Sequence, residues 1–408
     1  MTRTARIVGS DLEAPCRFRP DASRLATTQD ATTDSREQLR YAEVAVIGIR
    51  GIPASYGGLE TCAEHTTTYW ASKQLNVLVY CRKRHYAERP ATLGQVRLKY
   101  TASVPCASLD TLSHTFTSII DLLLRERHIK LVHLYNTGNA IFLPLLKLFG
   151  KKIVMSGDGL EWKRDKWGLM AKGAHMLGEH MAVMFADRII VDNEEVRKYY
   201  QRKYAARTSL IAYGAKFISK DEARSKKLLE KYSLEEKRYF IFVGRLVPEK
   251  GVHELINAYN QLNTQYPLVI VGDDVNNTPY RNSLLNHQSE KVRFLGFLYG
   301  DEYEQLLVNA LIYVSASKLE GTSPSLLAAM GARVCSLVNG IQENRASAGD
   351  GACLFEKNNF DDLRSKWQQL NDDPELVESM AEKGYRHACA HYQWRTISEQ
   401  YLSVFKDI

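Results

Sequence analysis

Short apolar runs alternate along the chain with segments whose apolar residues return every three or four positions. The run at residues 43–49 (EVAVIGI) is typical of a buried strand, and residues 59–73 that follow have the helical period. This alternation predicts βαβ units and a parallel sheet, because parallel strands need a crossover between them. We expect strands at residues 43–49, 76–80, 130–135, 152–155 and 188–191, and helices at 59–73, 140–149 and 169–186.

A strongly charged segment, residues 215–237, divides the pattern into two halves. It has almost no strand signal and predicts a linker with an exposed helix. The alternation then restarts, so the simplest architecture is two successive α/β domains with a ligand cleft between them. A last helix at 394–405 carries aromatic residues at helical spacing and must cover an apolar face. In this half we expect strands at 239–243, 268–271, 292–295 and 312–315, and helices at 252–262 and 301–309.

Residues 1–42 precede the first strand and show no sustained apolar period. Thr, Ser, Ala, Arg and Asp are frequent in them, so we expect a disordered extension. A transit peptide is the alternative, which the acidic residues of the segment disfavour. We expect no secretory signal and no membrane-spanning helix, because the longest apolar run, 141–149, is far too short for a bilayer.

Composition narrows the function only slightly. The chain has 408 residues, of which 45% are hydrophobic and 25% charged, and its net charge of +7 is mild for this length. Its seven cysteines are scattered without a C-x-x-C pair, so we expect neither a disulfide framework nor a structural zinc site, and a reducing cytosol fits. The sequence has no recognisable nucleic-acid-binding module, which argues against that class of protein.

The first glycine-rich loop, residues 50–58 (RGIPASYGG), follows the first predicted strand. It matches neither G-x-G-x-x-G nor the P-loop pattern, so neither a dinucleotide-dependent oxidoreductase nor a simple nucleoside triphosphatase is favoured. Gly57 and Gly58 precede a helix start, whose free N–H groups attract an anion. A tight strand-to-helix turn without a ligand is the alternative.

Two further loops follow strands of the second half. The loop VGRLVPEKG places Arg245 and Lys250 around a helix start, where two cations suit a diphosphate; an exposed basic turn is the alternative. The later loop carries Glu320, followed by the polar residues 321–323. A carboxylate beside free backbone amides suits sugar hydroxyls and phosphate together. The alternative is that Glu320 only partners a helix N-terminus.

In this order, the motifs resemble those of the retaining nucleotide-sugar glycosyltransferases of the GT-B fold. The second half contains VGRLVPEKG, VIVGD, VRFLG and EGTSPSLL. The first half contains GIRGIPASYGGLET, VYCR and DGLEWKRDKWG, which look like the bacterial subgroup that includes L-rhamnosyltransferases of surface polysaccharide synthesis. The resemblance covers about residues 43–405. It implies two Rossmann-like, doubly wound parallel-sheet domains that face a cleft.

The resemblance also implies a division of labour between the domains. After the extension at 1–42, residues 43–214 would form the acceptor-side domain and 215–237 the charged linker. Residues 238–392 would form the domain that binds the donor nucleotide-sugar. Residues 393–408 would form a helix that packs back on the first domain.

The implied donor site is electrostatic. Arg245 and Lys250 would neutralise the departing diphosphate, and Glu320 would contact the donor sugar. A donor phosphate oxygen would take the acceptor proton, so neither a metal nor a cofactor is implied, and the sequence shows no metal-ligand cluster. Other residues would frame the base, the sugar and the diphosphate: Gly272, Gly296, Phe297, Gly321, Thr322, Ser323, Gly57 and Gly58.

Asp158 is the candidate catalytic residue on the acceptor side, because it follows the strand at 152–155 and strand-end loops face the cleft. An Asx turn with Gly159 is the alternative. Glu161 and Arg164 follow in the same motif and are expected to shape the acceptor pocket. His133 is a further acceptor-side candidate, with a satisfied core histidine as the alternative.

Enzymes of this kind usually act on lipid-linked acceptors, and one segment of the sequence suits a membrane surface as well as a protein core. Basic residues at 163, 164, 166 and 172 precede or open the apolar helix at 169–186, which suits an anionic leaflet. A core helix with a charged first turn is the alternative. We therefore expect a cytoplasmic protein with no nucleic-acid partner. Peripheral contact with the cytoplasmic face of the membrane stays open beside the core helix, which the pattern favours slightly.

One position departs from the family pattern. The resemblance implies two Glu residues eight positions apart, of which the second accepts hydrogen bonds from the donor ribose. Here Ala328 stands eight positions after Glu320, and the following residues, 329–332, look about two residues shorter than the family's E-A-M-A-x-G. The sequence therefore predicts weak donor binding and places activity in doubt.

These inferences favour an enzyme that moves a hexose with retention to a glycan or lipid-linked acceptor. The subgroup resemblance implies L-rhamnose from dTDP-rhamnose. The alternative is a non-catalytic GT-B-fold protein that binds a sugar nucleotide or a partner enzyme, and Ala328 favours it.

Overall fold

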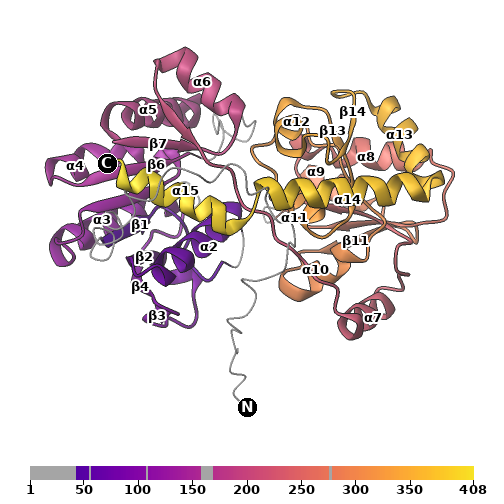
Figure 1. The fold of residues 1–408 in the computed structure, drawn as a ribbon, viewed down its shortest axis with the longest axis horizontal. Helices are drawn as coiled ribbons and strands as arrows, with labels where there is room; N and C mark the ends of the chain where they lie inside the picture. Colours follow the sequence, from indigo (N-terminus) through magenta and orange to yellow (C-terminus); the bar gives the residue numbers. More distant parts are fainter. Residues whose placement is uncertain (1–42, 55–56, 107–108, 158–168, 275–277) are drawn as a thin grey trace, which may run out of the picture.

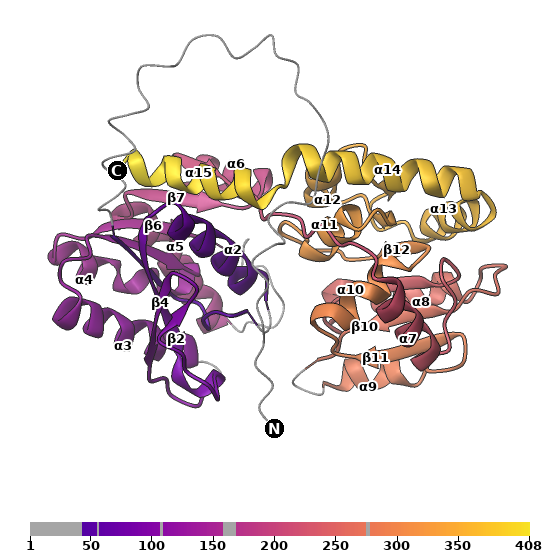
Figure 2. The ribbon, with the colours of Figure 1, turned by 60° about the horizontal axis from the view of Figure 1, so that its bottom comes forward.

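The computed structural model describes residues 43–54, 57–106, 109–157, 169–274 and 278–408. Two α/β domains lie side by side, and the last two helices of the chain run along both of them (Figure 1, Figure 2). Each domain is built on its own sheet, and all but one of the strand pairs are parallel. The predicted fold class is confirmed. The predicted extension at 1–42 lies outside the described residues.

The first domain has an eight-stranded sheet in the order β3-β4-β2-β1-β5-β6-β7-β8. Its central strand β1 is buried because its residues are apolar on both faces, as expected for a strand covered by helices on both sides. The elements are β1 (Glu43–Ile47), α2 (Gly58–Ser72), β2 (Asn76–Arg82), η2 (Lys83–His85), β3 (Thr92–Leu93), β4 (Val96–Thr101), α3 (Asp110–Arg125), β5 (Leu131–Tyr135), η3 (Thr137–Phe142), α4 (Leu143–Leu148), β6 (Lys152–Ser156), α5 (Leu169–Phe185), β7 (Arg188–Val191), α6 (Glu194–Tyr204) and β8 (Thr208–Leu210).

The second domain has a six-stranded parallel sheet in the order β11-β10-β9-β12-β13-β14. β9 and β12 are neighbours, so the strand order reverses between them. The elements are α7 (Glu222–Lys231), β9 (Phe240–Val243), η5 (Pro248–Lys250), α8 (Val252–Tyr259), β10 (Leu268–Val271), α9 (Pro279–Leu285), β11 (Val292–Gly296), α10 (Gly300–Val308), β12 (Ile312–Ser315), α11 (Pro324–Gly331), β13 (Cys335–Asn339), α12 (Gln342–Ala348), β14 (Cys353–Phe355), α13 (Phe360–Asp372) and α14 (Pro374–His391). The last helix, α15 (Trp394–Lys406), leaves this domain and packs on the first one.

The chain passes between the domains twice, and the two crossings touch. The amide of Ala215 donates a 2.7 Å hydrogen bond to the carbonyl of Tyr392. A Cβ on Gly214 would lie 2.3 Å from the indole of Trp394, so only glycine fits at this close approach. The outgoing and returning chains therefore form one paired connection.

After the second crossing, α15 packs on α2 of the first domain. The indole of Trp70 in α2 donates to the carbonyl of Ser398 at 3.0 Å, and the Tyr69 hydroxyl donates to Glu399 at 2.6 Å. The buried face of α15 includes Tyr401 and Phe405, whose rings lie 5.7 and 4.9 Å from that of Trp70. The last helix thus completes the core of the first domain.

The charged segment at 215–237 is only partly a linker. Within it, α7 lies against α10 through two ion pairs, Arg224 with Asp301 and Lys231 with Glu302. This helix is part of the second domain. An apolar period does not reveal it because its contacts with α10 are largely polar.

Candidate active site

Lys250 and Glu320 meet where the strand order of the second sheet reverses. Lys250 closes the loop after β9, and Glu320 lies in the loop after β12. In open α/β sheets, ligands bind outside the carboxyl ends of the strands at this point. The ammonium of Lys250 is 2.5 Å from Oε1 of Glu320, and only 18% and 10% of the two side chains are exposed. Both predicted donor groups therefore belong to one partly shielded ion pair.

Backbone contacts hold these two loops together. Gly251, with φ of +65°, is so close to the β12 loop that a Cβ there would lie 2.3 Å from the carbonyl of Ala316. Two residues after Ala316, the amide of Lys318 donates a 2.8 Å hydrogen bond to the carbonyl of Glu249. The position of Glu320 relative to Lys250 is therefore fixed by the main chain as well as by the ion pair.

Arg245 brings a second cation to the same edge of the sheet, since it follows β9 directly. Its guanidinium is half-buried and has no hydrogen-bond or ion-pair partner among the described residues. An arginine side chain stays charged at any physiological pH. Of the two predicted cations, one is thus neutralised by Glu320 and the other is available to an anion.

Three glycines pack together at the carboxyl ends of β9, β10 and β11. Gly272 has φ of +129°, and a Cβ there would lie 1.9 Å from the carbonyl of Gly244; its amide donates to Gly296 at 2.7 Å. The ring of Phe297 stacks on that of Tyr299 with their centroids 6.0 Å apart. The two glycines expected to frame the base, Gly272 and Gly296, are therefore in direct backbone contact, with no side chain between them.

Asp273, next to these glycines, is already paired with an arginine of the same domain. Arg281 donates to both of its carboxylate oxygens, at 2.7 and 3.0 Å, and these hydrogen bonds hold the pKa of Asp273 below its usual value. The carboxylate is thus a structural anchor for α9.

Gly57 and Gly58 bring the start of α2 against the second domain. A Cβ on Gly58 would lie 3.2 Å from the ring of Pro324, the first residue of α11. Gly57, with φ of +107°, leaves room for the Glu60 carboxylate, which a Cβ would approach to 2.3 Å. The two helix starts therefore face each other, but the start of α2 already has a carboxylate beside it.

Asp192, which the sequence pattern did not single out, reaches the loop between β12 and α11. We call this loop, residues 316–323, the donor loop. Oδ2 of Asp192 accepts a 3.0 Å hydrogen bond from the amide of Thr322, and the carbonyl of Asp192 accepts one from the Thr322 hydroxyl at 2.7 Å. The amide of Thr322 was expected to be free for a ligand, but it is already hydrogen-bonded to Asp192. Asp192 follows β7 as Asp158 follows β6, so the strand-end rule applied to Asp158 would have found it.

His133 does not line the cleft, and its predicted acceptor-side role is wrong. It is fully buried in β5, its Nε2 is 2.7 Å from the hydroxyl of Ser156, and its ring packs against Trp70, Tyr401 and Phe405. Burial lowers its pKa to about 3, so the ring is neutral. His133 is thus a core histidine, as in the alternative, but only its Nε2 is satisfied, because Nδ1 has no hydrogen-bond partner among the described residues.

The other acceptor-side candidates, Asp158, Glu161 and Arg164, lie outside the described residues, as do the basic residues at 163 and 166. Among the residues that the structure describes, no group of three or more His, Cys, Asp or Glu side chains is placed to hold a metal ion.

The segment that follows Glu320 by eight residues lies at the end of α11, and its predicted shortening is wrong. The segment from Ala328 to Arg333 has as many residues as the family's E-A-M-A-x-G. Arg333 stands at the glycine position and has φ of +52°, a left-handed conformation that glycine favours. The segment therefore keeps its length and backbone, while the family's Glu and Gly are replaced by Ala328 and Arg333.

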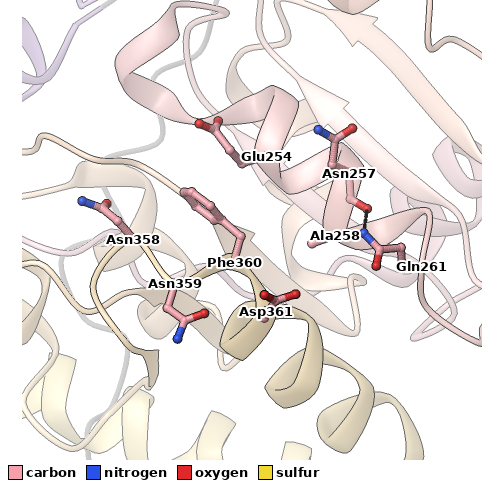
Figure 3. Close-up of a pocket in the computed structure, with 8 residues that line it drawn as sticks. All are labelled: Glu254, Asn257, Ala258, Gln261, Asn358, Asn359, Phe360 and Asp361. Carbon is pink, nitrogen blue, oxygen red and sulfur yellow. Dashed lines mark hydrogen bonds between the residues drawn. The ribbon is translucent and has the colours of Figure 1, made fainter.

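A cavity of about 500 Å³ lies between α8 and the start of α13 (Figure 3). Lys318 lies beside it, in contact with Glu254 and 5.7 Å from the centre of the Phe360 ring. Part of its polar lining is paired within the protein, as Gln261 is with Arg364. The cavity shares no lining residue with the Lys250–Glu320 site. Its lining residues are Glu254, Asn257, Ala258, Gln261, Asn358, Asn359, Phe360 and Asp361.

Two family models cover most of the chain. Residues 224–387 match the glycosyl transferases group 1, and residues 41–216 match a domain of unknown function, DUF1972. The sucrose-phosphate synthase of Thermosynechococcus elongatus superposes over 90% of this chain and 98% of its own, with a TM-score of 0.76 and 17% identity. The second domain thus matches the group 1 glycosyl transferase model, and the whole chain has the GT-B fold.

Other GT-B proteins and curated glycosyltransferases are similar too. Anabaena HepE in complex with UDP and glucose covers 90% of this chain and 100% of its own, with a TM-score of 0.74 and 16% identity. The O-antigen chain mannosyltransferase B of Escherichia coli is 25% identical over 49% of this chain and 54% of its own length. The α-D-kanosaminyltransferase of Streptomyces kanamyceticus is 27% identical over 56% of this chain and 63% of its own. The GT-B chain thus matches between half and two thirds of these two relatives.

Proposed function

We propose that this GT-B protein transfers a sugar from a nucleotide-diphosphate donor to a glycan or lipid-linked acceptor in cell-surface polysaccharide synthesis. The observation that carries the proposal is the Lys250–Glu320 pair at the reversal point of the second sheet, with Arg245, which has no partner among the described residues, at the same edge. A diphosphate leaving group needs cations, and a sugar hydroxyl needs an acceptor. The two kinds of group stand together in this loop cluster.

In the proposed reaction, Arg245 and Lys250 stabilise the charge that develops on the diphosphate as the sugar–oxygen bond breaks. Lys250 also orients Glu320, whose second oxygen accepts a hydrogen bond from the donor sugar. The acceptor attacks with retention, and its proton passes to a donor phosphate oxygen. This scheme uses no metal and no cofactor.

The proposed sugar is a hexose, and L-rhamnose from a dTDP donor follows from the sequence resemblance. The names of two relatives, a mannosyltransferase and a kanosaminyltransferase, support a donor of hexose type. HepE, a neighbour in fold, has been solved with UDP and glucose, which supports a nucleoside-diphosphate donor.

A calorimetric screen of dTDP-, UDP- and GDP-sugars tests the proposal. We expect one donor to bind and to yield a glycoside of unchanged anomeric configuration, read by NMR. Binding should be weaker in Arg245→Ala, which lacks one of the two cations. If no nucleotide sugar binds to a folded sample, the proposal is wrong.

We also propose that the first domain contacts the cytoplasmic face of a membrane. None of the described helices is long and apolar enough to span a bilayer. However, α5 exposes Met176, Leu177 and Met184, and the neighbouring α4 segment exposes Leu148 and Phe149. Apolar side chains of this kind insert at the headgroup boundary.

Flotation with vesicles containing anionic lipid tests this contact. We expect the protein to float, and a variant with Leu177→Glu and Met184→Glu to stay in the lower fraction. Equal flotation of both would show that this face does not bind the membrane.

Ala328 favours the second candidate, a non-catalytic sugar-nucleotide-binding protein. This candidate predicts donor binding without either transfer or hydrolysis, so prolonged incubation with the best donor separates the two.

A further inference from the structure

We propose that Asp192 is a positioning residue that reaches from the first domain into the second and fixes the donor loop when the domains are together. The inference rests on the proposed function only for its effect on catalysis. Asp192 and Thr322 are 5% and 4% exposed, so their two hydrogen bonds are shielded from water. A shielded carboxylate that accepts from a backbone amide makes a strong, directional contact.

The carboxylate of Asp192 is held in one orientation. Its second oxygen, Oδ1, accepts a 3.2 Å hydrogen bond from the side-chain amide of Asn193. The other end of the Asn193 side chain caps α6 by accepting from the amide of Val196 at 2.9 Å. The direction in which Asp192 meets the donor loop is therefore set by the start of a helix in the first domain.

The donor loop is shaped to receive this carboxylate. A Cβ on Gly321 would lie 2.6 Å from Oδ2 of Asp192. Gly321 does not have a left-handed backbone, so close approach rather than a special conformation requires glycine here. Gly321 and Asp192 are a matched pair, one from each domain.

The contact bears directly on Glu320. The loop is already held at one side, where the Lys318 amide donates to Glu249 within the second domain. Asp192 holds it at Thr322, on the other side of Glu320. With both sides fixed, the direction of Glu320 depends on the first domain being in place, and domain closure sets the geometry of the donor site.

Hydrogen exchange read by mass spectrometry tests the contact without any substrate. In the full chain we expect Asp192→Ala to raise exchange in the peptide that contains Thr322 by about tenfold or more, as loss of a hydrogen bond to a charged group allows. Asp187→Ala is the matched control. Asp187 accepts from the amide of Ile153 at 2.7 Å wholly within the first domain, so its loss should leave the donor loop unchanged.

A double substitution makes the test specific. Gly321→Ala alone should also raise donor-loop exchange, because the added methyl group meets the carboxylate. In the Asp192→Ala background the same substitution should cost little, since that carboxylate is gone. Additive effects would mean that the two residues act separately and would contradict the matched-pair argument.

With a donor in hand, Asp192→Ala should raise the donor KM at least tenfold, and Asp192→Asn should recover part of it because an amide oxygen can still accept from Thr322. The proposal is overturned if donor-loop exchange in Asp192→Ala equals that of the parent protein. If exchange rises as expected but no donor binds even to the parent, the proposed function fails and the domain contact stands.

Discussion

The residues of the candidate site differ in how far their charges are already satisfied. Lys250 is paired with Glu320, whereas Arg245 has no partner among the described residues. Losing Lys250 would leave a largely buried carboxylate unpaired, so its removal affects both the ligand and the protein. Losing Arg245 removes only a charge that the ligand would use.

Arg245→Ala and Lys250→Ala should each reduce transfer by orders of magnitude while the protein stays folded. Removing charge stabilisation from a shielded cleft raises a barrier by about 2.7–4 kcal/mol. Initial rates at saturating donor measure this, with circular dichroism as the check on folding. Lys226→Ala, an exposed cation on α7, should be neutral. Full activity in both site variants would reject their assigned role.

Ala328→Glu should tighten donor binding by roughly ten- to a hundredfold, the value of one hydrogen bond to a charged group. Because the segment from 328 to 333 has the family's length, this single substitution should suffice. Calorimetry with the best nucleotide sugar measures the affinity. Tight binding in the parent protein that Ala328→Glu leaves unchanged would show that no ribose contact is missing.

The sequence pattern singled out three charged residues of the candidate site but not Asp192, which holds the loop that carries one of them. Arg245, Lys250 and Glu320 stand out because loops after strands of a parallel sheet meet at one edge. Asp192 was missed because its partner lies in the other domain, 130 residues away in the chain. His133 was predicted to face the cleft, because a strand pattern does not say that α15 covers this face of the sheet.

At the scale of elements, the apolar strands were predictable, and the elements with mixed surfaces were not. The strands β1, β2, β5, β6 and β7 are mostly apolar. Their predicted ends differ from the observed ends by no more than two residues. α3 was missed because Ser and Thr are frequent in it, and such residues lower helix propensity. In the helix they bond back to the preceding turn, as Ser118 does to the carbonyl of His114 at 2.7 Å.

The packing of α15 on α2 gives a prediction at this scale. Tyr401 is 2% exposed and packs on Trp70, so Tyr401→Ala should lower the free energy of unfolding by about 3–5 kcal/mol, as for other large aromatic side chains. Urea unfolding followed by tryptophan fluorescence measures it. Tyr401→Phe keeps the ring and loses only a hydroxyl near the Cys62 thiol, so it should cost far less. Equal losses in the two variants would mean that ring packing is not what holds α15.

For the whole molecule, buried histidines should make stability depend on pH. Burial lowers the pKa of His65 to about 4 and those of His114 and His133 to about 3. In the unfolded chain these rings bind protons near pH 6.5, so the unfolded state gains protons first as the pH falls. Their contribution to stability is complete above about pH 6.5 and is lost as the pH falls, down to about pH 4 for His65 and about pH 3 for His114 and His133.

Each such histidine should lower the free energy of unfolding by about 1.4 kcal/mol per pH unit in that window. Urea midpoints between pH 7 and 5 measure the slope. His133→Phe should reduce the slope by about one proton, whereas His287→Gln, an exposed position, should not change it. A midpoint that stays constant from pH 7 to 5 would contradict the prediction.

The return of α15 to the first domain has a consequence for how the protein is made. The apolar face of α2 emerges early in synthesis, but the helix that covers it is made only after the strands of both sheets. At about 5–20 residues per second, that face waits roughly 20 to 70 seconds for its cover. The nascent first domain should therefore be a chaperone client until α15 has been made. A chain truncated before residue 394 should aggregate even though it contains the strands of both sheets.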